Sequence, residues 1–161
     1  MSNMPHPRPG MPPFRAEAPG KNILMAAGIG LIALNILRFF MAIPGILAAV
    51  FMLIIHDQTI LGELVIMHLL LSILALLFEV AIGIIGVVSC NKIEKGKTLF
   101  AVGIIFMALS TIYNIAFIVA MSSLDVIMDF GRILGIPITF VLSILLIVGA
   151  SKNKKAADNA V

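Results

Sequence analysis

Four long runs of apolar residues constrain this chain more than any other feature of its sequence. They cover residues 23–55, 60–89, 98–121 and 133–150, and the last two contain no charged residue. The chain of 161 residues is 61% hydrophobic and 12% charged, with a mean hydropathy of +1.15, whereas soluble domains are about half apolar and about a quarter charged. Apolar runs of this length, without alternation of polar residues, are typical of membrane-spanning helices. We therefore predict an all-α integral membrane four-helix bundle.

The basic residues predict how the chain lies across the membrane. Nine of the eleven Lys and Arg residues fall in the N-terminal tail, the segment between the second and third runs, and the C-terminal tail. They are Arg8, Arg15, Lys21, Lys92, Lys95, Lys97, Lys152, Lys154 and Lys155. The positive-inside rule then predicts a cell-membrane protein with both termini in the cytoplasm. At these positions the charges are expected to meet lipid headgroups, and no nucleic-acid partner is indicated.

The domain organisation follows from composition. Residues 1–20 contain six of the eight prolines and predict a disordered cytoplasmic tail, with a docking motif as the alternative. Residues 21–155 form the predicted four-span domain, and 156–161 a second cytoplasmic tail. The first apolar run is too long for the core of a signal peptide. The lone Cys90 is expected to be a buried packing residue, or else a palmitoylation site.

An internal repeat predicts two tandem helical hairpins. At an offset of 75 residues, the third run repeats residues of the first: the aligned pairs are Ala26 and Ala101, Gly28 and Gly103, Ile29 and Ile104, Ala33 and Ala108, and Leu34 and Leu109. The alternative is chance similarity, because membrane helices use few residue types. The first hairpin should be the longer one, since 33 residues span about 50 Å of helix and a bilayer core is about 30 Å thick. Pro44-Gly45 provides a site for a kink, and residues 124–134 predict an amphipathic helix at the outer surface.

Arg38 and Glu79 are ionisable residues that lie deep inside the apolar runs and should neutralise each other. Arg38 and Glu79 would each cost roughly 2.5–3.5 kcal/mol if left charged near mid-membrane. The first two helices are adjacent and antiparallel, and both residues lie at similar depth, so we predict an Arg38–Glu79 ion pair. Small and polar residues share the same faces: Gly28, Leu31, Asn35, Ala42, Gly45 and Ala49 on the first helix; His68, Ser72, Ala75, Gly83 and Gly86 on the second; and Gly103, Ser110 and Asn114 on the third. Such faces pack helices together in lipid.

The predicted intramembrane polar cluster comprises Arg38, Glu79, Asn35, His68 and Asn114. One interpretation is a structural clamp that fixes helix pairing. The other is an ion or small-solute path in an oligomeric channel or transporter subunit. Catalysis has little support, because the chain lacks the zinc-protease, nucleophile-elbow, phosphate-loop and CxxC motifs. His56, Asp57 and Glu63 offer at most a weak outer metal site. We therefore predict a protein that is not an enzyme, with no cofactor and no bound metal.

The segment GIIGVVSCNKIEKGKTLFAVGIIFMAL, residues 83–109, resembles the helix–basic loop–helix unit of small bacterial four-span families of unknown function. The overall plan is similar to that of MARVEL and CD20-like tetraspans. The short segment HDQT at 56–59 differs from the large outer loop of claudins, and the chain has no Cys-rich domain like that of the tetraspanins. The resemblance implies a non-catalytic tetraspan that acts by lateral association, with itself or with another membrane protein, as an accessory or assembly subunit.

Overall fold

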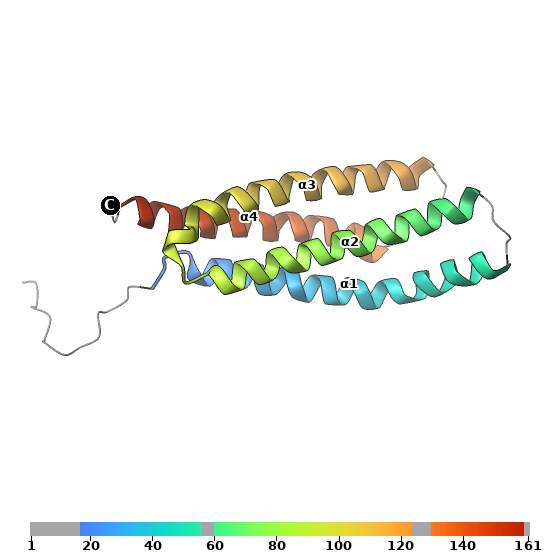
Figure 1. The fold of residues 1–161 in the computed structure, drawn as a ribbon, viewed down its shortest axis with the longest axis horizontal. Helices are drawn as coiled ribbons and strands as arrows, with labels where there is room; N and C mark the ends of the chain where they lie inside the picture. The colour runs from blue at the N-terminus through green and yellow to red at the C-terminus, as the bar shows by residue number, and fades with distance from the viewer. Residues whose placement is uncertain (1–16, 56–59, 124–129, 160–161) are drawn as a thin grey trace, which may run out of the picture.

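The protein is an all-α four-helix bundle, as its sequence predicts (Figure 1). The structure, a computed structural model, describes residues 17–55, 60–123 and 130–159. Within these ranges lie α1 (Lys21–Ile55), α2 (Ile60–Ser89), α3 (Gly96–Ser123) and α4 (Phe130–Asp158). A single 3₁₀ turn, η1 (Ile93–Lys95), joins α2 to α3.

All four helices are long and apolar enough to cross a membrane. The candidate spans are Lys21–Pro44, Leu69–Ser89, Ile93–Val119 and Gly135–Asp158. Large apolar side chains point outward, where lipid would solvate them: Phe40 is 62% exposed, Leu74 64% and Ile112 64%. Outward-facing apolar surface on this scale suits hydrocarbon and would be unstable in water. The chain is therefore a multi-pass membrane protein.

The helices pack as two hairpins joined through α1 and α4. Helix α1 packs along α2, α3 packs along α4, and the α1–α4 contact connects the two hairpins, whereas α2 and α3 approach each other far less over the described residues. The α2–α3 pair does have an aromatic contact, between Phe78 and Phe106, whose ring centroids are 5.9 Å apart. The bundle is thus closed along α1–α4 and loosely packed along α2–α3.

Glycine lets the backbones of the first hairpin touch. A Cβ atom on Gly28 would lie 2.5 Å from the Gly83 carbonyl oxygen, and one on Gly83 would lie 2.8 Å from the Gly28 carbonyl oxygen. Gly103, the residue aligned with Gly28, fits against Leu146 and Ile147 of α4 in the second hairpin. Small residues therefore set helix spacing at corresponding places in both hairpins, which agrees with the internal repeat.

The two hairpins are unequal, also as expected. Helix α1 has 35 residues, which correspond to about 52 Å at 1.5 Å per residue. It continues through Pro44, and the joined ends of α1 and α2 extend beyond those of α3 and α4 (Figure 1). The predicted amphipathic helix at 124–134 lies largely outside the described residues, as do the side chains of His56, Asp57 and Glu63.

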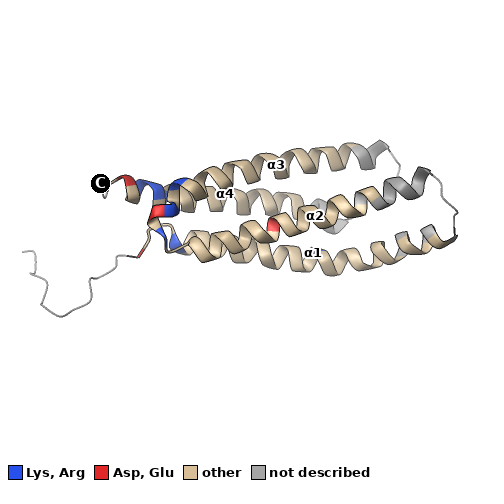
Figure 2. Cartoon of the chain, in the orientation of Figure 1, with Lys and Arg blue, Asp and Glu red and all other residues tan. Residues whose placement is uncertain are grey.

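The opposite end of the bundle is basic and is held together by buried hydrogen bonds. Lys residues gather there beside the C-terminus and the η1 turn (Figure 2). The side chain of Asn153 is fully buried: its Oδ1 accepts a hydrogen bond from the Gly20 N–H at 2.7 Å, and its Nδ2 donates to the Cys90 carbonyl oxygen at 3.2 Å. Cys90 is 5% exposed, which favours the packing role over palmitoylation. Just outside the bundle, a hydrogen bond from Lys21 lowers the pKa of the exposed Glu17 carboxyl group.

Helix α4 extends beyond its expected end. The sequence predicts that the last span ends at 150, yet the helix continues to Asp158. The buried Asn153 holds this extra segment, which also makes two less buried contacts: Lys154 Nζ lies 5.0 Å from the centre of the Phe100 ring, and Lys97 Nζ lies 2.8 Å from Asp158 Oδ1. Residues 151–158 contain no Gly or Pro, so nothing in the segment stops the helix.

Candidate functional site

The predicted ion pair between Arg38 and Glu79 is confirmed. Arg38 Nη1 lies 2.7 Å from Glu79 Oε2, and only 16% of the arginine side chain and 9% of the glutamate side chain are exposed. Arg38 lies 17 residues along α1 from Lys21, or about 25 Å, and Glu79 is at the middle of the α2 span. At 2.7 Å the contact is a charge-assisted hydrogen bond. It joins the two helices of the first hairpin inside the apolar part of the bundle.

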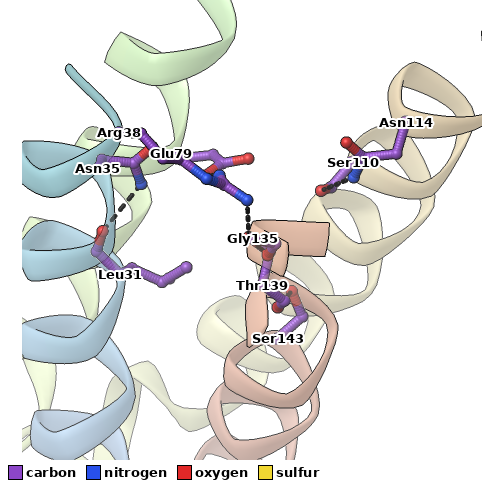
Figure 3. Close-up of polar contacts among 9 residues, drawn as sticks. All are labelled: Leu31, Asn35, Arg38, Glu79, Ser110, Asn114, Gly135, Thr139 and Ser143. Carbon is purple, nitrogen blue, oxygen red and sulfur yellow. Dashed lines mark hydrogen bonds and ion pairs between the residues drawn. The ribbon is translucent and has the colours of Figure 1, made fainter. Parts of the chain in front are cut away.

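The guanidinium group also reaches the second hairpin, which the sequence does not predict. Arg38 Nη2 donates a hydrogen bond to Thr139 Oγ1 on α4 at 2.8 Å (Figure 3). Thr139 Oγ1 in turn donates to the Gly135 carbonyl oxygen at 3.0 Å, and Ser143 Oγ donates to the Thr139 carbonyl oxygen at 2.7 Å. A Cβ atom on Gly135 would overlap the guanidinium group. Gly135 therefore makes the room in which Arg38 lies against α4.

The signal for this α4 contribution is present in the sequence. Gly135, Thr139 and Ser143 recur at intervals of four, and all three are buried. This is the same kind of small and polar face that identifies the interior of the other three helices. An interior face on α4 is therefore readable from the sequence, although the particular hydrogen bond to Arg38 is not.

Asn35 lies one turn from Arg38 on the same face of α1. It is 1% exposed, and its Nδ2 donates to the Leu31 carbonyl oxygen at 2.8 Å, while its Oδ1 is buried and accepts no hydrogen bond from the described residues. Figure 3 shows the amide nitrogen turned back to Leu31 and the amide oxygen on the side of Arg38 and Glu79. The nitrogen must face Leu31, because a carbonyl oxygen there can only accept. This assignment leaves the amide oxygen directed at the polar interior.

A small cavity adjoins the ion pair. Its volume is about 80 Å³, and it lies between α1, α2 and α3. The polar residues that line it are Asn35, Arg38, Ser72, Glu79, Tyr113 and Asn114. Tyr113 donates a long hydrogen bond to Ser72 Oγ across the α2–α3 side, at 3.4 Å. The cavity is thus a partly open recess in which polar side chains gather within an apolar bundle; we call it the Asn35 pocket.

The structure brings together four of the five predicted cluster residues. Asn35, Arg38, Glu79 and Asn114 all line the Asn35 pocket. Asn114 is half-buried on α3, and its Nδ2 donates to Ser110 Oγ at 3.4 Å. The fifth residue, His68, is on α2, but its side chain lies outside the described part of the chain. Within that part, no group of three or more His, Cys, Asp or Glu residues could hold a metal ion.

A second cavity lies between α3 and α4. It has a volume of about 250 Å³ and is lined mainly by apolar side chains, including Ile115, Ile118, Pro137 and Phe140. Several of these residues are exposed at the surface that faces lipid: Ile115 is 57% exposed and Phe140 49%. The cavity is therefore an open crevice into which lipid chains can extend. Asn114 lines both cavities.

Fold and site together define a class: a helical, multi-pass membrane protein built of two hairpins with a buried ion pair. Comparisons with protein-family models, with curated proteins and with solved structures found no match to the chain. The resemblance to small tetraspans therefore stays a prediction. The function is therefore inferred from the geometry of the chain itself.

Proposed function

We propose that this is a non-catalytic tetraspan that acts in the membrane by lateral association, as an accessory or assembly subunit. In this proposal the Arg38 group is a structural clamp. The observation that carries it is the position of the guanidinium group, which contacts Glu79 on α2 and Thr139 on α4 while it packs over Gly135. A guanidinium that is held by three helices is suited to fixing their arrangement.

The long first hairpin supports association with a partner. Helix α1 is longer than the thickness of a bilayer core of about 30 Å, and apolar side chains continue to its end: Leu47 is 64% exposed, Phe51 64% and Ile54 77%. In an upright helix these side chains would leave the hydrocarbon, which is unfavourable unless the helix tilts or another protein covers them. We propose that a membrane protein, either a second copy or a different chain, covers this end. The membrane is the cell membrane, with the basic end of the bundle in the cytoplasm.

The clamp is tested by removing the charges singly and together. Replacing only one partner, as in Arg38→Met or Glu79→Leu, leaves the other charge buried, and we expect a loss of about 3–5 kcal/mol in the free energy of unfolding. The double variant Arg38→Met/Glu79→Leu leaves no unpaired charge, and its stability should be restored to near that of the wild type. Chemical unfolding in detergent measures the free energy of unfolding of the two single variants and the double variant. Lys97→Met, which removes an exposed pair, is the control and should change little.

A second function, conduction of an ion or small solute in an oligomer, is favoured by the polar pocket beside the ion pair. Flux measurements on proteoliposomes distinguish conduction from a purely structural clamp. The clamp proposal expects no flux above that of empty liposomes, and crosslinking in native lipid should capture a complex through the outer end of α1. A selective flux in the wild type that disappears in the stably folded double variant would establish conduction and contradict the clamp.

A further inference from the structure

The Asn35 pocket contains a buried hydrogen-bond acceptor that the described residues leave without a donor. Asn35 is 1% exposed, its Oδ1 has no partner among them, and the opposite end of its amide is fixed by the Leu31 carbonyl oxygen. Buried polar atoms in proteins nearly always have a hydrogen-bond partner. An atom that has none and faces a cavity indicates a bound molecule that donates to it.

Charge decides which kind of molecule fits. Arg38 and Glu79 line the same pocket and are paired at 2.7 Å, so their charges cancel. A bound cation would lie close to the guanidinium group and a bound anion close to the carboxylate, and either would lose its hydration on entering. A neutral molecule with an O–H group avoids both penalties, and the neighbouring Ser72 and Asn114 side chains can donate to it or accept from it.

Size and access narrow the choice further. A volume of about 80 Å³ accommodates a few water molecules, each of which occupies about 30 Å³ in the liquid, or the hydroxyl end of a slender alcohol. The remaining walls are apolar and include Met41, Ala75 and Leu76. The pocket is lined by α2 and α3, the loosely packed pair of neighbouring helices, so a molecule dissolved in the hydrocarbon can approach between them.

We propose that the Asn35 pocket binds a neutral hydroxyl group, which donates its hydrogen bond to Asn35 Oδ1. The hydroxyl comes either from water or from a membrane-dissolved alcohol. The site depends on the orphaned amide oxygen and the neutral surroundings, and it holds whether or not the protein associates laterally.

The test uses the full chain in liposomes and two probes. The first is a diazirine-bearing octanol, whose photolabelled residues are located by mass spectrometry, with unlabelled octanol or octane as competitor. The second is radiolytic hydroxyl-radical labelling, which oxidises side chains next to bound water. Here the oxidation of Tyr113 is measured. The variant is Asn35→Leu, which removes the acceptor and keeps the branched shape and the number of heavy atoms of the side chain. The control is Thr111→Val, because Thr111 is exposed and, among the described residues, bonds only within its own helix, to the Met107 carbonyl oxygen.

Alcohol as the source predicts photolabelling around the pocket that octanol suppresses and octane does not. In Asn35→Leu the octanol concentration that halves labelling should rise about tenfold, equivalent to about 1.4 kcal/mol, with no change in Thr111→Val. If water is the source, we expect no such photolabelling. Tyr113 should instead be oxidised in the wild type, and its oxidation should decrease in Asn35→Leu. If octane competes as well as octanol, or if neither signal depends on Asn35, the proposal is wrong. If Asn35→Leu does not fold, the comparison of octanol with octane and the oxidation of Tyr113, both measured on the wild type, test the proposal instead.

Discussion

The arginine on α1 is the residue on which the arrangement of the helices depends. Its two terminal nitrogens go to different hairpins, Nη1 to Glu79 and Nη2 to Thr139. A lysine has a single ammonium group and cannot reproduce this forked geometry. The residue opposite, Gly135, is as necessary as the two hydrogen-bond partners, because only a residue without a Cβ atom leaves space for the guanidinium group.

Gly135→Ala should therefore destabilise the protein although alanine favours helix. In the interior of a helix, Gly→Ala normally increases the free energy of unfolding by about 0.5–1 kcal/mol. At Gly135 the new methyl group overlaps the guanidinium, and the displacement should cost about 1–3 kcal/mol, as overpacking does elsewhere. Chemical unfolding in detergent measures the difference.

Gly86→Ala is the matched control, since a Cβ there meets its nearest neighbour at an ordinary 3.5 Å. It should keep or increase stability. Equal effects of the two substitutions would show that Gly135 has no special relation to Arg38.

The interior faces of α1 and α2 follow directly from residue spacing in the sequence. Gly28, Asn35, Glu79 and Gly83 are all buried, because small and polar residues in lipid are stable only against another helix. The ion pair could be predicted for the same reason: each charge needed a partner, and only one was at the right depth. The Thr139 contact could not, because it depends on how far α4 lies from α1, which no local pattern specifies.

The end of α4 shows a second kind of limit. Polar residues such as Lys152 and Asn153 mark the end of an apolar run, and the sequence predicts that the hydrocarbon stops there. A helix can continue past that boundary when tertiary contacts hold it, and here the buried amide of Asn153 does so by bonding Gly20 and Cys90. These two hydrogen bonds join residues that are 133 and 63 positions apart in the sequence. No local sequence pattern can predict contacts over such separations.

Asn153→Ala should loosen the basic end of the bundle. It leaves the Gly20 N–H and the Cys90 carbonyl group buried without their partner, at a cost of about 1–3 kcal/mol for each group left unsatisfied. Hydrogen exchange of the amides at the start of α1 should become faster while those near Arg38 are unchanged. The exposed Asn22 is the control, and Asn22→Ala should leave the exchange pattern intact; slow exchange in Asn153→Ala would contradict this role.

At the scale of the molecule, one end of the bundle gathers the lysines and the other extends as an apolar hairpin (Figure 2). This asymmetry predicts the orientation in the cell. A reporter that is active only outside the cytoplasm, fused after Val161, should be inactive, whereas a reporter that fluoresces only in the cytoplasm should be bright. Fusions within 56–59 should give the opposite result. Activity of the external reporter at the C-terminus would mean that the bundle is inverted.

The placement of the ion pair bears on how such a chain enters a membrane. Arg38 and Glu79 belong to α1 and α2, which are synthesised before α3 and α4, and they neutralise each other within that hairpin. The hairpin can thus partition into lipid as an electrically balanced unit before α3 and α4 exist. Thr139, which arrives with α4, then adds a neutral hydroxyl to a charge already compensated, so the guanidinium need not be unpaired while the second hairpin is inserted.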